Sequence, residues 1–123
     1  MAVRALRGAT TLDEDTAEQM YTRVKALFNA LYDRNGLTNE DVISVVLTAT
    51  PDITAAFPAT AARAFGLDDV ALIGAQELQV PGALPRCVRV LLHVDVDRPR
   101  QELRHVFLEG AAVLRPDLGD AGA

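Results

Sequence analysis

The sequence predicts an α+β fold in which a mixed β-sheet carries its helices on one face. Residues 87 to 96 alternate between aliphatic and more polar side chains, which is typical of a half-buried strand. Residues 17 to 31 place apolar side chains three and four positions apart, which is typical of an amphipathic helix. Residues 42 to 50 form an almost continuous apolar run. Because strand and helix patterns follow one another along the chain, we expect the helices to pack on a single sheet.

The N-terminal part of the chain predicts one strand and one long helix. Residues 2 to 11 alternate like a strand and place Arg7 where the chain looks half buried. The run Asp15-Thr16-Ala17-Glu18 predicts a capping box, because an N-cap side chain is followed by a glutamate three residues on. The helix is expected to run to about Arg34, and Asn35-Gly36 is expected to end it.

The middle of the chain predicts two strands around a short helix. Residues 42 to 50 are expected to form a buried central strand, because they are apolar almost throughout. An alanine-rich helix is expected from about Ala59 to Phe65, with Pro58 favouring its start. Residues 70 to 75 predict another short apolar strand.

Residues 88 to 96 predict the last long strand. One face is aliphatic and is expected in the core: Val88, Val90, Leu92, Val94 and Val96. The opposite face carries Arg89 in mid-strand, where a buried cation is costly unless it has a partner. After this strand we expect a helix over residues 101 to 108, with its apolar residues facing inward.

Length and composition indicate one domain and exclude several kinds of partner. With 123 residues, we expect a single domain over residues 1–118 and a disordered tail over residues 119–123. The net charge of −5 argues against a general nucleic-acid or anionic-membrane binder, which would carry a basic patch. There is no apolar run of signal-peptide or membrane-span length. We therefore expect a soluble, cytoplasmic protein without nucleic-acid or membrane partners.

The single cysteine, Cys87, fits a reducing compartment and is expected to be structural. It has no CxxC partner, and His93 and His105 are not spaced as a recognised metal motif. We therefore expect no metal site. No Ser/His/Asp or Cys/His set stands out either.

A group of arginines is the remaining chemical signal: Arg7, Arg63, Arg89 and Arg115 each stand next to apolar or small residues. Arginine suits bidentate recognition of carboxylates. The carboxylate of Glu77 lies just upstream of Arg89, across a Pro-Gly-Ala-Leu-Pro connection. Such a set suggests a small dianionic ligand that bears a hydroxyl group. The simpler alternative is that Arg89 pairs with Glu77 or reaches solvent along its aliphatic stem.

Six short motifs follow one another between Arg4 and Leu118, and each alone is a weak signal. They are Leu6-Arg7-Gly8-Ala9-Thr10-Thr11, Ala49-Thr50-Pro51-Asp52 followed by Ala56-Phe57-Pro58-Ala59, Gln76-Glu77, Arg86-Cys87-Val88-Arg89-Val90, Arg104-His105-Val106-Phe107-Leu108, and Leu114-Arg115-Pro116-Asp117-Leu118. Their order and spacing together are specific, and nearly the whole chain resembles the monofunctional chorismate mutases of the trimeric AroH class.

The resemblance implies a homotrimer with a pseudo-α/β-barrel core, outer helices, and active sites in clefts between adjacent subunits. We expect each subunit to be ferredoxin-like. The implied reaction is the rearrangement of chorismate to prephenate, the branch step toward phenylalanine and tyrosine. This reaction is unimolecular and pericyclic, so no cofactor is expected.

The resemblance also implies roles for individual residues. Arg89 would place a cation at the ether oxygen, Arg7 would bind a substrate carboxylate, and Glu77 would accept a hydrogen bond from the ring hydroxyl. Five further positions are implied to line the substrate site: Phe57, Arg63, Gly74, Phe107 and Arg115. Phe107 replaces a common tyrosine, Gly74 replaces a cysteine that can assist the ring hydroxyl, and Thr60 replaces a lysine at the cleft mouth.

A second hypothesis is a non-catalytic module that binds a small molecule of the aromatic pathway on the same trimeric scaffold. A pure binder would need neither the cation at the ether oxygen nor the full set of site residues. Retention of Arg89 and Glu77 therefore favours the enzyme.

Overall fold

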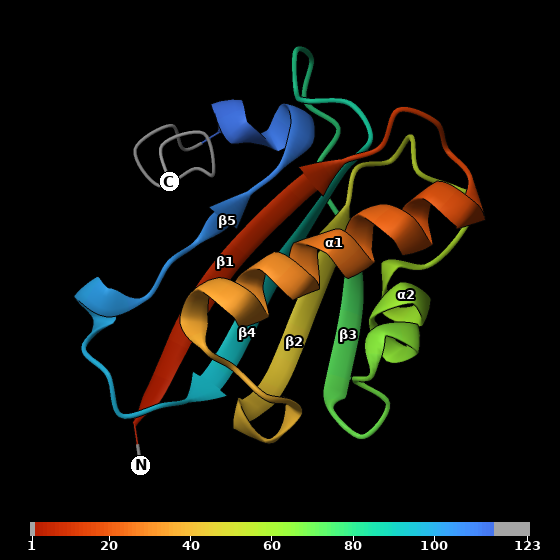
Figure 1. Cartoon of the computed structure of the whole chain (residues 1–123). Helices are drawn as coiled ribbons and strands as arrows, with labels where there is room; N and C mark the ends of the chain where they lie inside the picture. Colours follow the sequence, from red (N-terminus) through yellow and green to blue (C-terminus); the bar gives the residue numbers. More distant parts are fainter. Residues whose placement is uncertain (1, 115–123) are drawn as a thin grey trace.

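The computed structural model describes residues 2–114, which form a sheet flanked by two α-helices (Figure 1). The elements are β1 (Val3–Thr11), α1 (Ala17–Asn35), β2 (Val42–Ala49), α2 (Pro58–Phe65), β3 (Ala71–Gln76), β4 (Cys87–Asp95) and β5 (Val106–Phe107). Three short 3-10 helices complete the described part: η1 (Asn39–Asp41), η2 (Arg100–Glu102) and η3 (Glu109–Val113). The predicted order of strands and helices is confirmed as far as β4.

The strands form one mixed sheet in the order β3-β2-β4-β1-β5. The central strand, β4, runs antiparallel to both β1 and β2. The edge strands run parallel to their neighbours, β3 to β2 and β5 to β1. Because β4 separates β1 from β2, these two strands and α1 form the split β-α-β unit found in ferredoxin-like folds. The predicted mixed α+β fold is confirmed.

The long helix α1 begins and ends at side chains with clear local roles. Its N-cap is Thr16, whose hydroxyl accepts a hydrogen bond from the backbone N–H of Gln19. The predicted capping box was therefore misplaced by one residue, because Asp15 instead bonds a distant loop. At the other end Gly36 adopts a left-handed conformation with φ 61°, as expected for a glycine that ends a helix.

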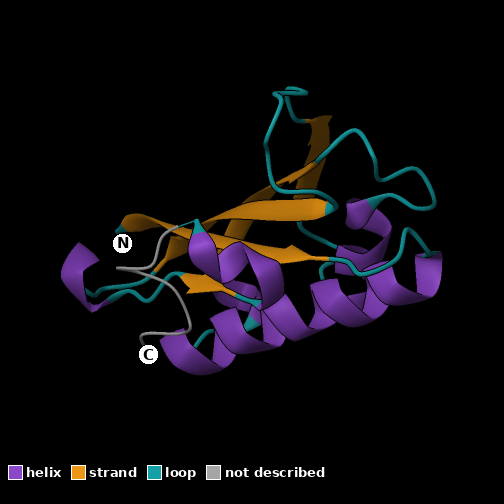
Figure 2. Cartoon of the chain, turned by 90° about the horizontal axis from the view of Figure 1, so that it is seen from above, coloured by secondary structure: helices purple, strands orange, loops and turns teal. Residues whose placement is uncertain are grey.

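Both α-helices lie on the same side of the sheet (Figure 2). The core on this side contains Leu27 and Leu31 of α1, which are fully buried with Leu92 of β4. Gly8 of β1 lets α1 approach closely, because a Cβ atom there would meet the Leu31 and Leu27 side chains at 3.0 and 3.1 Å. This packing holds β1 and β4 in a fixed register and so fixes the residues on their opposite faces.

The face of the sheet opposite the two helices, here called the open face, carries apolar residues that remain exposed. One row across the sheet joins Arg7, Leu91, Val46 and Ile73. Ile73 is 65% exposed, and Val3 at the far end of β1 is 50% exposed. The buried central strand predicted over residues 42 to 50 is found as β2, which lies between β3 and β4, but only one of its faces meets the core of the single chain.

The predicted helix over residues 101 to 108 is wrong. This segment forms η2 and then β5, where Val106 pairs with Gly8 and Phe107 with Ala9. The free edge of β1 offers backbone hydrogen bonds that a short helix would forgo. The predicted tail over residues 119–123 lies outside the described residues, and the single domain over residues 1–118 stays a prediction. In the described part of the chain, no helix is long and apolar enough to cross a membrane.

Candidate active site

The centre of the candidate site is an ion pair between Arg89 of β4 and Glu77, which directly follows β3. The Nε atom of Arg89 donates to both carboxylate oxygens of Glu77, at 3.1 and 3.0 Å. The hydroxyl of Thr48 donates to the same carboxylate at 2.6 Å. Both bonds from Arg89 use Nε, so they do not occupy its two outer nitrogens, Nη1 and Nη2. The geometry therefore fixes a cation and an anion side by side.

The sheet register explains why these three side chains meet. Thr48 of β2 pairs directly with Arg89 of β4, and cross-strand partners point to the same face of a sheet. The backbone N–H of Glu77 donates to the carbonyl of Ala49, which prolongs the β2–β3 ladder by one residue. The sequence suggested the Arg89–Glu77 pair, but it did not single out Thr48. Its place on the alternating face of β2 was the available signal.

Arg7 and Phe107 form a second contact on the open face. The guanidinium carbon of Arg7 lies 5.6 Å from the centre of the Phe107 ring. Phe107 is fully buried in a small cluster with Ala9, Cys87 and Ala111. The ring thus forms a fixed support beneath the Arg7 cation, a cation–π arrangement that favours charge over an aromatic face.

The backbone of Arg7 is also fixed from the side of β5. Its N–H donates to Nδ1 of His105 at 2.9 Å. The β5 ladder begins only at Gly8 and Val106, so the imidazole takes the place of a backbone acceptor one residue earlier. On the open face, Arg7 pairs with Leu91, two residues along β4 from Arg89. The two arginines are therefore diagonal neighbours on adjacent strands.

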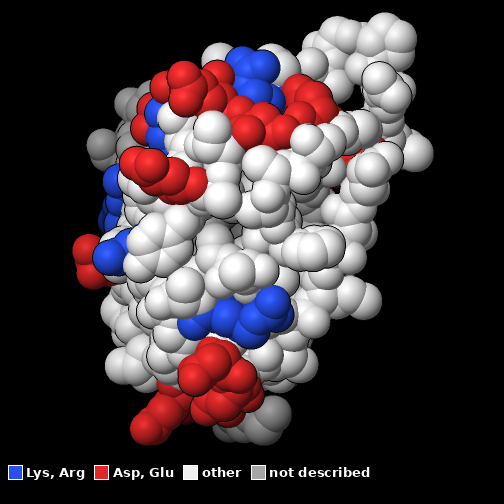
Figure 3. Space-filling view, turned by 90° about the vertical axis from the view of Figure 1, so that its right-hand side faces the viewer, with Lys and Arg blue, Asp and Glu red and all other residues white. Residues whose placement is uncertain are grey.

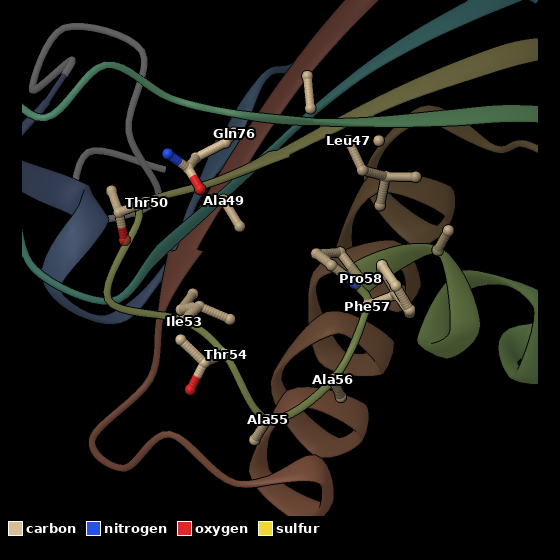
Figure 4. Close-up of a pocket in the computed structure, with 13 residues that line it drawn as sticks. Leu47, Ala49, Thr50, Ile53, Thr54, Ala55, Ala56, Phe57, Pro58 and Gln76 are labelled. Carbon is tan, nitrogen blue, oxygen red and sulfur yellow. The ribbon is translucent and has the colours of Figure 1, made fainter.

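A cavity of about 510 Å³ lies on the helix side of the sheet, between β2, β3 and the segment that leads into α2 (Figure 4). Its lining is mainly apolar and includes Leu47, Phe57 and Gly74. Phe57 is 76% exposed at its wall. The surface seen from the β3 and α2 side is largely uncharged over its middle, with acidic side chains gathered toward the top and bottom of the view (Figure 3). A compact basic group lies just above the lower acidic group, and further basic side chains lie at the top and along the left edge.

The end of β3 connects the two parts of the candidate site. Gln76 lines the cavity, and the next residue, Glu77, pairs with Arg89 on the open face. Successive residues of a strand point to opposite faces. Within one chain, the sheet thus separates Phe57 and Gly74 from Arg89 and Glu77.

Two of the predicted residues do not join either group in the described structure. Arg63 is exposed on α2, and its only short contact among the described residues is a 3.5 Å hydrogen bond to the hydroxyl of Thr60. Arg115 lies outside the described residues. The predicted roles of both stay predictions.

The segment from Thr50 to Phe57 forms one wall of the cavity and is anchored by Asp52. The Asp52 carboxylate accepts hydrogen bonds from the Thr50 hydroxyl at 2.6 Å and from the Arg86 backbone N–H at 3.1 and 2.9 Å. Burial alone would raise the pKa of Asp52, but these bonds outweigh it and leave the pKa below its usual value of 3.8. Asp52 thus ties the start of the wall to the start of β4.

Cys87 behaves as the structural cysteine that the sequence predicted. It is fully buried, and this burial raises the pKa of its thiol to about 11, so the thiol stays protonated at neutral pH. Within residues 2–114, no group of three or more His, Cys, Asp or Glu side chains is arranged to hold a metal ion.

Comparison with known proteins places the chain in a family. The family model described as chorismate mutase type I matches residues 3–118. The chorismate mutase AroH of Thermus thermophilus is 44% identical over 120 residues, covering 97% of this chain and 98% of that protein. The chorismate mutase AroH of Bacillus subtilis strain 168 is 43% identical over 119 residues, covering 96% and 94%.

The fold leads to the same group of proteins. The structure of a chorismate mutase from Clostridium thermocellum superposes with a TM-score of 0.87 at 42% sequence identity. The match covers 89% of this chain and 98% of that one. Because the family model and both relatives span nearly the whole chain, the protein described here belongs to the type I chorismate mutase family.

Proposed function

We propose that this protein converts chorismate to prephenate, and that Arg89, Glu77 and Arg7 carry the reaction. Family membership supports the reaction. The observation that carries the residue assignment is the pairing of Arg89 with Glu77, which holds a cation and a hydrogen-bond acceptor in one place. The reaction is a unimolecular pericyclic rearrangement, so it needs no nucleophile, proton transfer or cofactor.

The first contribution of the site is to hold chorismate in its compact reactive shape. Chorismate carries two carboxylates and a ring hydroxyl, and its two reacting carbons must lie close together before a bond forms. Arg7 binds one carboxylate, and Glu77 accepts a hydrogen bond from the ring hydroxyl. Fixing both ends of a flexible substrate removes the entropic part of the barrier. The Phe107 ring beneath Arg7 limits the positions open to this guanidinium.

The second contribution is electrostatic. As the C–O bond breaks, negative charge develops on the ether oxygen, and the outer nitrogens of Arg89 donate to it. The bond from Nε to Glu77 holds the guanidinium plane in place. A donor that is already oriented stabilises the transition state more than the substrate, so it raises kcat.

The complete site is formed between copies of the chain in a homotrimer with a pseudo-α/β-barrel core. Two observations support this assembly. The open face exposes Ile73 and Val3, which a barrel of sheets would bury. The substrate-site residues also fall into two sets on opposite faces of one sheet, with Phe57 and Gly74 on one and Arg89 and Glu77 on the other. In a closed ring, the first set of one subunit meets the second set of its neighbour.

A direct assay tests the proposed function. Purified protein is mixed with chorismate, and the loss of chorismate and the appearance of prephenate are followed together against buffer alone. We expect saturable acceleration with prephenate as the only product. Absence of acceleration would reject the enzyme and leave the non-catalytic binding module, which equilibrium binding of chorismate would then detect.

A further inference from the structure

A carboxylate outside the six motifs holds the wall of the cavity. Oδ1 of Asp15 accepts hydrogen bonds from the backbone N–H groups of Thr54 and Ala55, at 3.1 and 3.0 Å. Oδ2 accepts from the Thr54 N–H at 3.0 Å and from the Thr54 hydroxyl at 2.7 Å. Thr54 and Ala55 both line the cavity. The hydrogen bond from the Thr54 side chain is the main reason that the pKa of Asp15 lies below its usual value.

Asp15 is itself held on a rigid support. Thr16 caps α1, so the Asp15 side chain is free to bond the loop. The side-chain oxygen of Gln19 accepts hydrogen bonds from the backbone N–H groups of Asp13 and Glu14, and thereby ties the preceding segment to α1. Arg23 of α1 adds a bond to the Thr11 carbonyl at 2.6 Å. The helix that packs against the sheet thus determines where the Asp15 carboxylate lies.

The wall that Asp15 holds leads directly to Phe57. Figure 4 shows the chain running from Thr50 around the cavity to Phe57, with Thr54 and Ala55 between them. Asp52 anchors the start of this wall through Arg86, and α2 begins directly after it. Between these two ends, Phe57 is 76% exposed, so the single chain offers its ring little packing. Ile53 and Ala56 of this wall pack against the core, and the Asp15 carboxylate adds four hydrogen bonds to the residues between them.

We propose that Asp15 is a positioning residue for substrate binding, which keeps the Thr54–Phe57 wall in its binding-competent position. This inference rests on the proposed function. Without the carboxylate, the wall is in its binding-competent position in only a fraction of the molecules. The apparent affinity for substrate falls in proportion to that fraction. Saturating substrate restores the closed wall. The effect is therefore on KM, and kcat is preserved.

The test compares Asp15→Asn with Asp13→Asn by steady-state kinetics on chorismate. Asp13→Asn removes the same charge just before α1, but the Asp13 carboxylate bonds Arg23 and not the loop. We expect KM to rise about tenfold for Asp15→Asn with kcat within about twofold of wild type, since bonds to a charged acceptor are among the stronger ones. Asp13→Asn should leave both values unchanged.

Thr54→Val provides a graded variant, because it removes one of the four bonds and keeps the backbone bonds. We expect a smaller rise in KM. The double variant Thr54→Val with Asp15→Asn should raise KM no further than Asp15→Asn alone, because both changes remove the same interaction.

Amide hydrogen exchange at Thr54 and Ala55 gives a readout that does not depend on activity. Exchange should accelerate in Asp15→Asn and not in Asp13→Asn. Faster exchange with an unchanged KM would make Asp15 a purely structural anchor and would overturn the proposal, as would unchanged exchange. A loss confined to kcat would also overturn it. If wild-type protein does not convert chorismate, the proposed function fails and this inference falls with it, whereas an active wild type with an unchanged variant KM rejects the inference alone.

Discussion

The ion pair between Arg89 and Glu77 orients the Arg89 guanidinium but is expected to add little to the stability of the fold. The side chain of Arg89 is 33% exposed, and that of Glu77 is 15% exposed. Solvent screens such a pair, so we expect it to contribute no more than about 1 kcal/mol to the free energy of unfolding. Its main effect is to orient the guanidinium. Substitution of Arg89 should therefore affect the reaction more than the fold.

Arg89→Lys should fold normally and lose most of its activity. Lysine keeps the positive charge. Its single nitrogen, however, cannot replace the planar guanidinium, which bonds Glu77 through one nitrogen and the ether oxygen through the others. Loss of an oriented donor of this kind lowers kcat by about 10²- to 10³-fold. Steady-state kinetics, with circular dichroism to check the fold, measure this effect.

The matched control for that variant is Arg100→Lys, because Arg100 is an exposed arginine of η2 away from the site. It should keep wild-type kinetics. If Arg89→Lys raised only KM and kept kcat, Arg89 would bind the ground state and transition state equally, and its assigned role would be wrong.

At the level of elements, the segment from Thr50 to Phe57 depends on residues distant from it in the chain. Asp15 holds its middle, and Asp52 connects its start to Arg86 beside β4. Its geometry is therefore set by the packing of α1 and by the position of β4. These bonds act together with the packing of Ile53 and Ala56 against the core to give a defined wall.

The bonds of Asp52 predict a pH dependence of stability. A carboxyl group whose pKa is lowered in the folded state stabilises the fold above its unfolded pKa, near 3.8, and this contribution disappears as the pH falls through the lower folded value. We expect Asp52→Asn to be less stable than wild type at pH 7. The difference in unfolding free energy should shrink below pH 3.8. Urea unfolding across this pH range measures it.

Asp33→Asn serves as the control for acid stability, because Asp33 is exposed on α1. Its stability difference from wild type should be small at every pH. If the difference in unfolding free energy between Asp52→Asn and wild type stayed constant down to the lowest pH, the charge of Asp52 would not be the source of its stabilising effect.

At the level of the whole molecule, the uneven covering of the sheet is the main feature. The helices bury one face, while the open face and the connection after β3 expose apolar residues, including Ile73 at 65%, Leu78 at 85% and Val80 at 56%. Exposed apolar surface of this kind is typical of protein interfaces. The proposed homotrimer accounts for it by burying the open face between subunits.

Ile73→Glu should dissociate the proposed trimer without unfolding the subunit. Ile73 is largely exposed in the single chain, so a charge there should leave the subunit core intact, whereas burial of that charge between subunits would be costly. Sedimentation velocity at micromolar concentration should show a trimer for wild type and a smaller species for the variant. Chorismate turnover should fall in parallel, since the proposed site is shared between subunits.

The control for assembly is Tyr21→Glu, which adds the same charge at a residue 40% exposed on α1, on the other side of the sheet. It should remain trimeric and active. A wild-type protein that sedimented as a monomer and kept full activity would reject both the trimer and the shared site.

The sequence alone determined the features that depend on neighbouring residues. The alternation in β4 and the apolar stripe of α1 are local periodicities, and Gly36 ends α1 by its own backbone freedom. The resemblance indicated the family because its motifs are short runs of neighbouring residues. The polarity of the second face of β4 also indicated that Arg89 needs a partner, and the pair with Glu77 that the structure shows was one of the alternatives left open.

Only the tertiary structure decided the features that depend on residues far apart in the chain. Residues 101 to 108 look helical alone, but Val106 and Phe107 join the free edge of β1 about 100 residues away, because that edge supplies backbone partners. Asp15 looks like a helix cap, but its carboxylate accepts a hydrogen bond from the backbone N–H of Thr54, which is 39 residues distant. Thr48 becomes a partner of Glu77 only through the pairing of β2 with β3, which Glu77 prolongs by one residue. Local pattern cannot report such contacts, because strand pairing and the packing of α1 bring together partners that are distant in the chain.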